Sequence, residues 1–495
     1  MPFVPVDSID PQRLKIARET LCSVFNIPSL HPFQEKVGLN VLQGKHTMLD
    51  VPTGGGKTLA FWFALFYYWQ PGCTDEASNK IVLVIGPLVA LLEAQAQLLN
   101  SKGIPAIAVT SNTPDLEQAL TTKKLGQNQY RVGFLGPEMG LTPLFHEKVL
   151  NSIPFTKNII NLIIDEVHCI SEWGTNDFRP EYRKIVELAA RLPPGTPITG
   201  ATATAPDEVM RDILDVLGLP ADTAKVQVSN AKPNVSLAVQ QLQNEPDSFA
   251  DLLLLFPNSI KAPEEFPQTL IYVNDRQTAE KIQDFLRDHA PSCFDPKKAF
   301  EFYHRHVHED RKVDIQTRIA SGELRAVSAT DALGLGMDFR SIERVILWMK
   351  PRTFLSTVQK IGRCARDFTK RGEAVLYITK NMRTRCYAES ESLREDVETG
   401  NEGSEGSEDE GEEVGHDREL ALEEMDQQEG ENTEERVDRP SFQQRVSKKK
   451  KQSEIQLRDE RFLLEFIVTE ACRRRVWDRF FGNESKGKLA LGVAK

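Results

Sequence analysis

Residues 51–58, with the sequence VPTGGGKT, combine the residue types that bind the phosphates of a nucleoside triphosphate. The three consecutive glycines let the backbone turn tightly and present successive N–H groups to phosphate oxygens. Lys57 supplies a positive charge for the β- and γ-phosphates, and the Thr58 hydroxyl is placed to hold Mg²⁺. A helical pattern over 59–69 follows, so the positive end of that helix would face the same phosphates. Val51 stands where the common pattern has glycine, and the alternative to a phosphate-binding loop is an ordinary glycine turn.

Two adjacent carboxylates follow an apolar run farther along the chain. Residues 158–165, NIINLIID, predict a buried strand that ends at Asp165, and Glu166 comes next. A carboxylate at a strand end beside a phosphate-binding loop can hold the Mg²⁺ of a bound nucleotide, and we assign this role to Asp165. Glu166 would polarise the water molecule that attacks the γ-phosphate. The alternative is an acidic pair exposed to solvent at the end of a strand.

Two arginines in the second half of the chain could complete such a site. Arg363 and Arg366 are three residues apart, so on a helix both guanidinium groups would reach one cluster of phosphates. A guanidinium supplied across a cleft stabilises the transition state of phosphoryl transfer. The alternative is plain surface charge.

The elements that position these residues follow an α/β pattern. Continuous apolar runs at 80–86, 158–165, 268–273 and 344–348 predict buried parallel strands separated by segments of helical length. The pattern predicts two α/β domains, over 1–228 and 229–388. Residues 389–452 form an acidic, low-complexity linker that cannot bury enough surface to order itself, and 453–495 form a short helical segment.

Polar residues also follow one more apolar segment of the first domain. Residues 200–205, GATATA, carry hydroxyl groups that could link the hydrolysis site to the neighbouring domain by hydrogen bonds. Small-residue turns are common in proteins of every kind, so this tract by itself is only weak evidence.

Composition indicates an intracellular protein without a membrane partner. The net charge of −11 is concentrated in residues 389–435, whose 21 acidic residues and two arginines sum to −19 and leave +8 for the rest of the chain. A mildly basic body is compatible with a nucleic-acid partner. The seven cysteines are widely spaced, as in a protein of reduced thiols, and the longest apolar stretch, 59–69, is too short to cross a bilayer. No secretory signal opens the chain, so we do not expect a secreted protein.

Taken in order, these segments resemble the superfamily 2 helicases and, more closely, the RecQ family of DNA helicases. Residues 165–182, DEVHCISEWGTNDFRPEY, look like the DEAH box of that family running into its aromatic-rich loop. In the family this loop senses single-stranded DNA, so the resemblance gives that role to Trp173, Phe178 and Arg179, with sequence-independent stacking on bases. The alternative is that both aromatic residues belong to the core.

The resemblance also implies the remaining site residues and the cofactors, ATP and Mg²⁺. It implies two tandem RecA-like domains, with Gln34 of the segment LHPFQ reading the adenine and Thr330 contacting nucleic acid. The residues that would carry the chemistry are Lys57, Asp165, Glu166, Arg363 and Arg366. Thr58 and Asp165 would hold Mg²⁺. The residues expected to bind the nucleotide are Gln34, Thr53, Gly54, Gly55, Gly56, Lys57, Thr58, Gly336 and Asp338.

Four departures from the family pattern stand out. Thr175 and Asn176 replace one histidine of the aromatic-rich loop, and Val167 replaces the alanine of the box. The arginine motif reads GRCARD rather than GRAGRD. Cys472 resembles the first ligand of the RecQ zinc module, but one thiolate cannot build a tetrahedral site, so we expect no structural zinc. The residues 304–308, HRHVH, lack further ligands at suitable spacing, and we do not expect a metal there either.

The leading interpretation is an ATP-dependent DNA helicase that moves 3′ to 5′ and acts on single-stranded and tailed duplex DNA. One alternative is a DNA-dependent ATPase or translocase that does not unwind DNA, because the winged helix and complete zinc module are not evident. Another is a non-catalytic DNA-binding relative. The basic cluster Lys448–Lys451 predicts import into the nucleus; if it is only a solvated charge run, the protein would be cytoplasmic.

Overall fold

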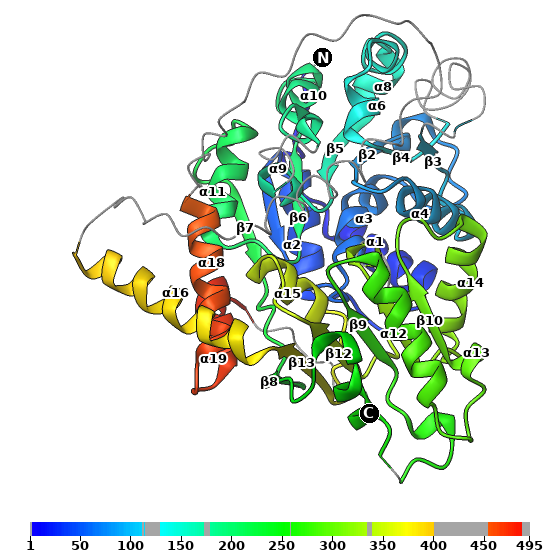
Figure 1. Cartoon of the computed structure of the whole chain (residues 1–495). Helices are drawn as coiled ribbons and strands as arrows, with labels where there is room; N and C mark the ends of the chain where they lie inside the picture. The colour runs from blue at the N-terminus through cyan, green and yellow to red at the C-terminus, as the bar shows by residue number, and fades with distance from the viewer. Residues whose placement is uncertain are drawn as a thin grey trace, which may run out of the picture.

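The two halves of the chain each fold around a parallel β-sheet (Figure 1). The computed structural model describes residues 2–110, 113, 129–172, 179–257, 259–333, 339–399 and 454–487. Lys448–Lys451 and most of the expected linker lie outside these ranges. The predicted fold class, two tandem RecA-like α/β domains, is confirmed.

The first sheet has seven strands, and each pairs in parallel with its neighbours. Its predicted strands at 80–86 and 158–165 appear as the adjacent central strands β2 and β5. The order across the sheet is β3 (Ala106–Val109), β4 (Val132–Leu135), β2 (Ile81–Ile85), β5 (Ile159–Ile164), β6 (Ile198–Thr202), β1 (Thr47–Asp50) and β7 (Ala224–Gln227).

The second sheet has six strands and is also parallel throughout. The predicted strands at 268–273 and 344–348 are its adjacent strands β9 and β12. Its order is β10 (Phe300–Tyr303), β11 (Ala326–Ala329), β9 (Thr269–Tyr272), β12 (Arg344–Trp348), β13 (Gly372–Ile378) and β8 (Val235–Gln241).

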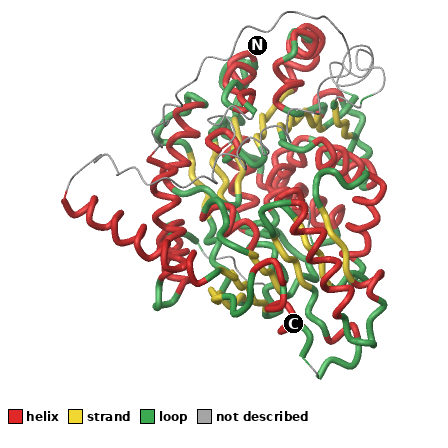
Figure 2. The backbone as a smooth tube through the Cα atoms, in the orientation of Figure 1, coloured by secondary structure: helices red, strands yellow, loops and turns green. Residues whose placement is uncertain are grey.

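Helices surround both sheets, as the distribution of helical and extended backbone shows (Figure 2). Alternate side chains of β2 belong to different hydrophobic clusters: Val82 and Val84 pack on one face, and Leu83 and Ile85 on the other. Burial on both faces explains why the strands are continuous apolar runs rather than alternating ones.

The first domain contains α1 (Pro11–Phe25), α2 (Pro32–Leu42), α3 (Lys57–Tyr68), α4 (Val89–Ser101), α6 (Pro137–Leu141), α7 (Pro143–Phe145), α8 (Ile153–Asn158), α9 (Cys169–Glu172), α10 (Ile185–Arg191) and α11 (Asp207–Val216).

The helices of the second half include the C-terminal segment. They are α12 (Arg276–His289), α13 (Pro296–Ala299), α14 (Glu309–Ala320), α15 (Phe354–Ile361), α16 (Lys380–Thr399), α18 (Glu454–Val468) and α19 (Arg473–Phe481). Helix α16 runs past residue 389, so the expected start of the linker falls inside a helix.

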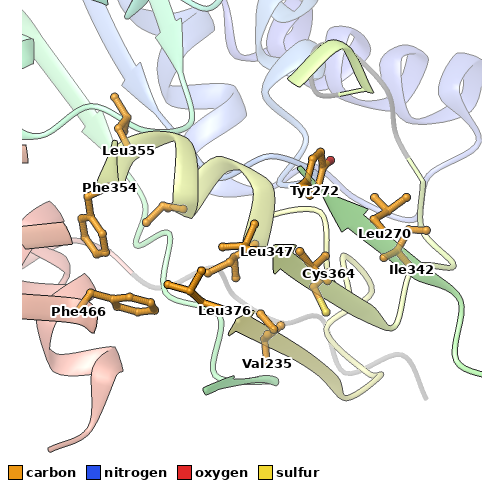
Figure 3. Packing of buried hydrophobic residues seen from close by; sticks show 14 of the residues in the cluster. Val235, Leu270, Tyr272, Ile342, Leu347, Phe354, Leu355, Cys364, Leu376 and Phe466 are labelled. Carbon is orange, nitrogen blue, oxygen red and sulfur yellow. The ribbon is translucent and has the colours of Figure 1, made fainter. Parts of the chain in front are cut away.

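The described part of the C-terminal segment, residues 454–487, packs against the second domain. Its apolar side chains share one hydrophobic cluster with β8, β9, β12 and α15. Phe466 of α18 faces Phe354 of α15, with ring centroids 5.4 Å apart (Figure 3). Trp477 of α19 is 1% exposed in the same cluster. Most apolar side chains of the segment therefore complete the core of the second domain, while Ile455 packs against a cluster of the first.

A carboxylate of the C-terminal segment also caps α15. Asp459 accepts hydrogen bonds from the amides of Phe354 and Leu355, at 2.6 and 3.0 Å, and Thr353 caps the amide of Ser356. These amides belong to the first turn of α15, whose N–H groups have no partner within the helix. Asp459 thus joins two segments that lie about a hundred residues apart in sequence.

Replacing Asp459 with alanine should therefore destabilise the second domain. Loss of a helix cap costs about 1 kcal/mol, and up to about 2 kcal/mol in some proteins. Thermal unfolding of Asp459→Ala should show a lower midpoint than the wild type, whereas Glu460→Ala, one residue along the same helix, should not. Equal midpoints for all three proteins would show that the cap contributes nothing.

Two further observations concern the cysteines and the lengths of the helices. All seven cysteines lie in described parts of the chain and none forms a disulfide. Within the described ranges, no helix has the length and apolar character needed to cross a membrane.

Candidate active site between the two domains

The phosphate-binding loop connects β1 to α3, and its glycines meet different steric demands. Gly54 and Gly56 have φ angles of 81° and 84°, in the left-handed region that side chains disfavour. A Cβ atom on Gly55 would lie 2.8 Å from Cγ1 of Val51 and 2.9 Å from the carbonyl oxygen of Pro52. Val51, which replaces the usual glycine, is fully buried in the core. This position therefore anchors the loop to the sheet.

Lys57 and Gln34 hold the loop from inside the first domain. The Nζ atom of Lys57 donates to the carbonyl of Val51 at 3.1 Å. The side-chain amide of Gln34 donates to the carbonyl of Gly56 at 2.9 Å and accepts from the amide of His31 at 2.8 Å. Gln34 is thus fixed against the loop, next to where a nucleotide would sit. The glycine turn, the N-terminus of α3 and Lys57 are groups suited to binding a triphosphate. Thr53 lies within the loop, and Thr58 lies in the first turn of α3.

The acidic pair follows β5 directly, as predicted. Asp165 is 9% exposed, and its Oδ1 accepts a hydrogen bond from the amide of Glu166 at 3.0 Å. Burial, together with the negative charge of Glu166, raises the pKa of Asp165 to about 6. Glu166 has a φ angle of 48°, which is unusual for a residue with a side chain and is typical of functional sites.

Positive groups from both domains act on Glu166. Burial opposes its ionisation, yet its pKa is lowered, because the combined influence of Lys57, His168, Arg363 and Arg366 outweighs burial. The structure therefore brings all five predicted catalytic residues into one site.

Arg363 and Arg366 reach this site from a turn, not from a helix as we predicted. Helix α15 ends at Ile361, and the chain then turns through Ala365, whose φ angle is 41°. The turn is held by Lys232, which donates to the carbonyls of Gly362 and Cys364 at 2.8 and 2.6 Å. A residue in the left-handed conformation cannot continue a helix. The chain therefore turns at Ala365, between the two arginines.

The side chain of Arg366 lies over the phosphate-binding loop of the other domain. Its Cδ atom is 3.7 Å from the position that a Cβ atom on Gly54 would occupy. Both arginines are largely buried, with 9% and 6% exposure for Arg363 and Arg366. The contact places a guanidinium group of the second domain at the loop where phosphates would bind.

The left-handed Ala365 leads to a testable prediction. An L-residue in this conformation costs about 1–2 kcal/mol, part of which the greater chain entropy of glycine offsets. Ala365→Gly should therefore raise the midpoint of thermal unfolding. The same change in helix α10, Ala189→Gly, should lower it, by about 1 kcal/mol in stability. A lower midpoint for both variants would contradict a strained backbone at residue 365.

A second set of contacts joins the domains beside the acidic pair. His168 Nδ1 lies 3.0 Å from Oγ1 of Thr202, and His168 Nε2 lies 3.3 Å from the side-chain nitrogen of Gln359. Gln359 also donates to Oγ1 of Thr204 at 3.2 Å. The hydroxyl groups of residues 200–205 thus link the site to the second domain, as we predicted.

Sequence reasoning missed Gln359 and Lys232 as residues of the site. Gln359 precedes Arg363 by only four residues, and this closeness in sequence to a predicted site residue could have identified it. For Lys232 the sequence contains no such signal, because its two acceptors are main-chain carbonyls 130 and 132 residues away.

The predicted nucleic-acid contacts are only partly within the described ranges. Trp173, Phe178, Gly336 and Asp338 lie outside them, as do Thr175 and Asn176. Arg179 is described: it pairs with Glu138 at 2.5 Å and donates to the carbonyl of Pro87 at 2.6 Å. Thr330 follows β11, and its amide donates to the carbonyl of Tyr303 at 3.2 Å.

Metal-ligating side chains do not gather elsewhere in the described ranges, where no group of three or more His, Cys, Asp or Glu residues could hold an ion. Cys472 is exposed at the start of α19. His304 lies 2.9 Å from Oε1 of Glu280, as in an ordinary polar pair. The expected absence of zinc remains a prediction.

Comparisons with known proteins agree with this geometry. Residues 31–213 match the family model of the DEAD/DEAH box helicases, and residues 250–367 match the helicase conserved C-terminal domain. The first match contains the phosphate-binding loop and the acidic pair, and the second contains both arginines.

The chain is also similar to curated helicases. It is 30% identical over 351 residues to the probable ATP-dependent DNA helicase RecS of Bacillus subtilis, covering 71% of this chain and 64% of that protein. It is 28% identical over 361 residues to the ATP-dependent DNA helicase RecQ of Pasteurella multocida, covering 73% of this chain and 52% of that protein. The chain thus matches between half and two thirds of the length of these relatives.

Solved structures share the fold at low sequence identity. The Mycobacterium smegmatis helicase Lhr, bound to ssDNA and AMP-PNP, superposes with a TM-score of 0.54 at 23% identity, covering 77% of this chain and 50% of that one. The DEAD-box helicase Mss116, bound to ssRNA and UDP-BeF, has a TM-score of 0.59 at 16% identity, covering 87% and 84% of the two chains. With its two helicase family matches and its likeness to RecS and RecQ, the chain contains a two-domain helicase core similar to that of the RecQ family.

Proposed function

We propose that this protein is an ATP-dependent DNA helicase that couples ATP hydrolysis to 3′-to-5′ movement on single-stranded DNA and to unwinding of tailed duplexes. The observation that carries the proposal is that the two domains meet at one site. Arg366 of the second domain lies at the phosphate-binding loop, and Gln359 contacts the polar residues beside the acidic pair of the first. A site shared in this way can convert ATP hydrolysis into a change in the relative position of the two domains.

The residues of the chain would divide the chemistry as follows. The loop amides and Lys57 would hold the triphosphate, and Thr58 and Asp165 would hold Mg²⁺; bound MgATP supplies the phosphoryl group that is transferred to water. Glu166, whose lowered pKa keeps it ionised at neutral pH, orients the attacking water and accepts its proton. Arg366 presents positive charge where the γ-phosphate would develop negative charge.

DNA contacts would come from the loop after the acidic pair. The proposal that Trp173, Phe178 and Arg179 contact DNA rests on the resemblance of this loop to that of the RecQ family, and on the position of Arg179. Through Glu138, Arg179 connects the end of the loop to the start of α6. A loop joined to the acidic pair by only a few residues could report DNA binding to the hydrolysis site.

The test combines hydrolysis with strand separation. ATP hydrolysis should rise when single-stranded DNA is added, and Lys57→Ala should abolish it under both conditions. A duplex with a 3′ tail should be unwound, and one with a 5′ tail should not. Equal hydrolysis with and without DNA would contradict a DNA-driven motor. Stimulated hydrolysis without strand separation would instead support a translocase, and DNA binding without hydrolysis a non-catalytic relative.

A further inference from the structure

The C-terminal segment contacts the first domain as well as the second. Arg458 of α18 pairs with Glu208 of α11 at 3.1 Å. At its other end, Lys486 pairs with Asp50, the last residue of β1, at 2.5 Å. Figure 1 shows α18 and α19 beside α16, with the upper end of α18 close to α11. Residues 454–487 therefore connect the two domains without taking part in either sheet.

Main-chain and side-chain bonds fix the end of this segment on the connection between the domains. Gly487 forms a parallel bridge with Val228, and its carbonyl accepts from the amide of Ser229 at 2.7 Å. Asn230 makes three more hydrogen bonds with the segment. Its Oδ1 accepts from Trp477 at 2.9 Å and from the side chain of Asn483 at 3.0 Å, and its amide donates to Oδ1 of Asn483 at 3.2 Å. Lys486 thus lies between anchored neighbours, which bring its side chain to Asp50.

The ion pair of Lys486 and Asp50 is buried, with side-chain exposures of 3% and 1%. Burying two charges costs free energy that their attraction only partly returns, so such a pair adds little stability by itself. The carboxylate nevertheless stands directly before the phosphate-binding loop. Burial raises the pKa of Asp50, and the opposing influences come from Lys486, then from Lys57 and a hydrogen bond with Gln227. Lys57, the phosphate-binding lysine, is therefore within electrostatic reach of Asp50.

We propose that Lys486 is a positioning residue for the nucleotide site: it neutralises Asp50, so that Lys57 remains available to the phosphates. Without Lys486, Lys57 is a cation that still acts on the buried carboxylate, and the two would attract each other away from the nucleotide. Docking of the C-terminal segment then sets the affinity of the first domain for ATP. This inference rests on the proposed function, because it assumes that the loop binds ATP.

Removing either charge should destabilise the protein, but only one removal should weaken nucleotide binding. Lys486→Met leaves Asp50 charged, so the dissociation constant for a fluorescent ATP analogue should rise about tenfold, equivalent to about 1.4 kcal/mol. The KM for ATP should rise with it, while kcat changes less than about twofold. Asp50→Asn leaves Lys486 without its charged partner, so it should lower the unfolding midpoint. It also leaves no carboxylate to attract Lys57, so the dissociation constant should remain that of the wild type.

The double variant and a matched control complete the test. Asp50→Asn combined with Lys486→Met should restore nucleotide affinity, and Arg475→Met, at an exposed position of the same segment, should leave it unchanged. Equal loss of affinity in Lys486→Met and Asp50→Asn would overturn the inference and indicate a purely structural pair. If Lys486→Met does not fold, unrestored affinity in the double variant would overturn it. Wild-type protein that binds no nucleotide would instead refute the proposed function.

Discussion

Glu166→Gln should reduce DNA-stimulated ATP hydrolysis by about 10²- to 10⁴-fold, the usual contribution of a positioned general base. Glutamine keeps the size of the side chain but cannot accept a proton from water. Glu166 is held by an unusual backbone conformation with a φ angle of 48°, directly after Asp165 at the end of β5. The lysine and arginine groups around it keep the carboxylate ionised. Its position and its charge are thus both fixed before a nucleotide binds.

Binding and hydrolysis must be measured separately for this variant. The affinity for a fluorescent ATP analogue should stay within a few-fold of the wild type, because the loop and Lys57 are unchanged. Glu187→Gln, an exposed glutamate of α10, should hydrolyse ATP at the wild-type rate. If Glu166→Gln retained more than about a tenth of the activity, another group would have to act as the base.

Arg366→Ala should reduce kcat for hydrolysis by about 10³-fold or more, the effect expected for an arginine finger. The side chain comes from the second domain, and its Cδ atom lies 3.7 Å from the Cβ position of Gly54. Because its charge is needed most in the transition state, the KM for ATP should change much less than kcat. Arg363, which also lowers the pKa of Glu166, lies in the same turn, and Arg363→Ala should have a smaller effect.

Two further variants separate charge from geometry. Arg366→Lys keeps the positive charge but loses the planar, forked donor group, so it should recover only a small part of the activity. Arg352→Ala, at an exposed position before α15, should behave as the wild type. An Arg366→Ala protein with nearly normal kcat would show that the domains do not close over the nucleotide in the way proposed.

The sequence was sufficient where function depends on neighbours along the chain. The phosphate-binding loop is one run of eight residues, and the acidic pair comes directly after a strand whose apolar pattern is easily recognised. Each strand predicted from a continuous apolar run is present, because burial on both faces of a parallel sheet requires such runs.

The sequence did not predict the backbone conformation that carries the two arginines. Their spacing predicted a shared helix face, and both side chains do reach one site. They do so from a turn that contains the left-handed Ala365 and is held by Lys232, a residue 130 positions before Gly362. The periodicity of a short segment cannot reveal a turn that is stabilised by a distant lysine.

The C-terminal segment shows the same limit on a larger scale. Its helical pattern was evident from the sequence, but its partners were not. In the structure Asp459 caps α15, and Lys486 reaches a carboxylate 436 residues earlier in the chain. The contribution of each of these charged groups depends on a partner that only tertiary packing brings close.

The sequence by itself determined the chemistry of this protein: a phosphate-binding loop, an acidic pair, two arginines and the parallel sheets that carry them. These features are local, since each is set by a short run of residues and its periodicity. Only the tertiary structure decided how the pieces cooperate, with Arg366 placed at the loop of the other domain and Lys486 beside Asp50. Such contacts join residues far apart in the chain, and their energies depend on burial and distance, which no short segment specifies.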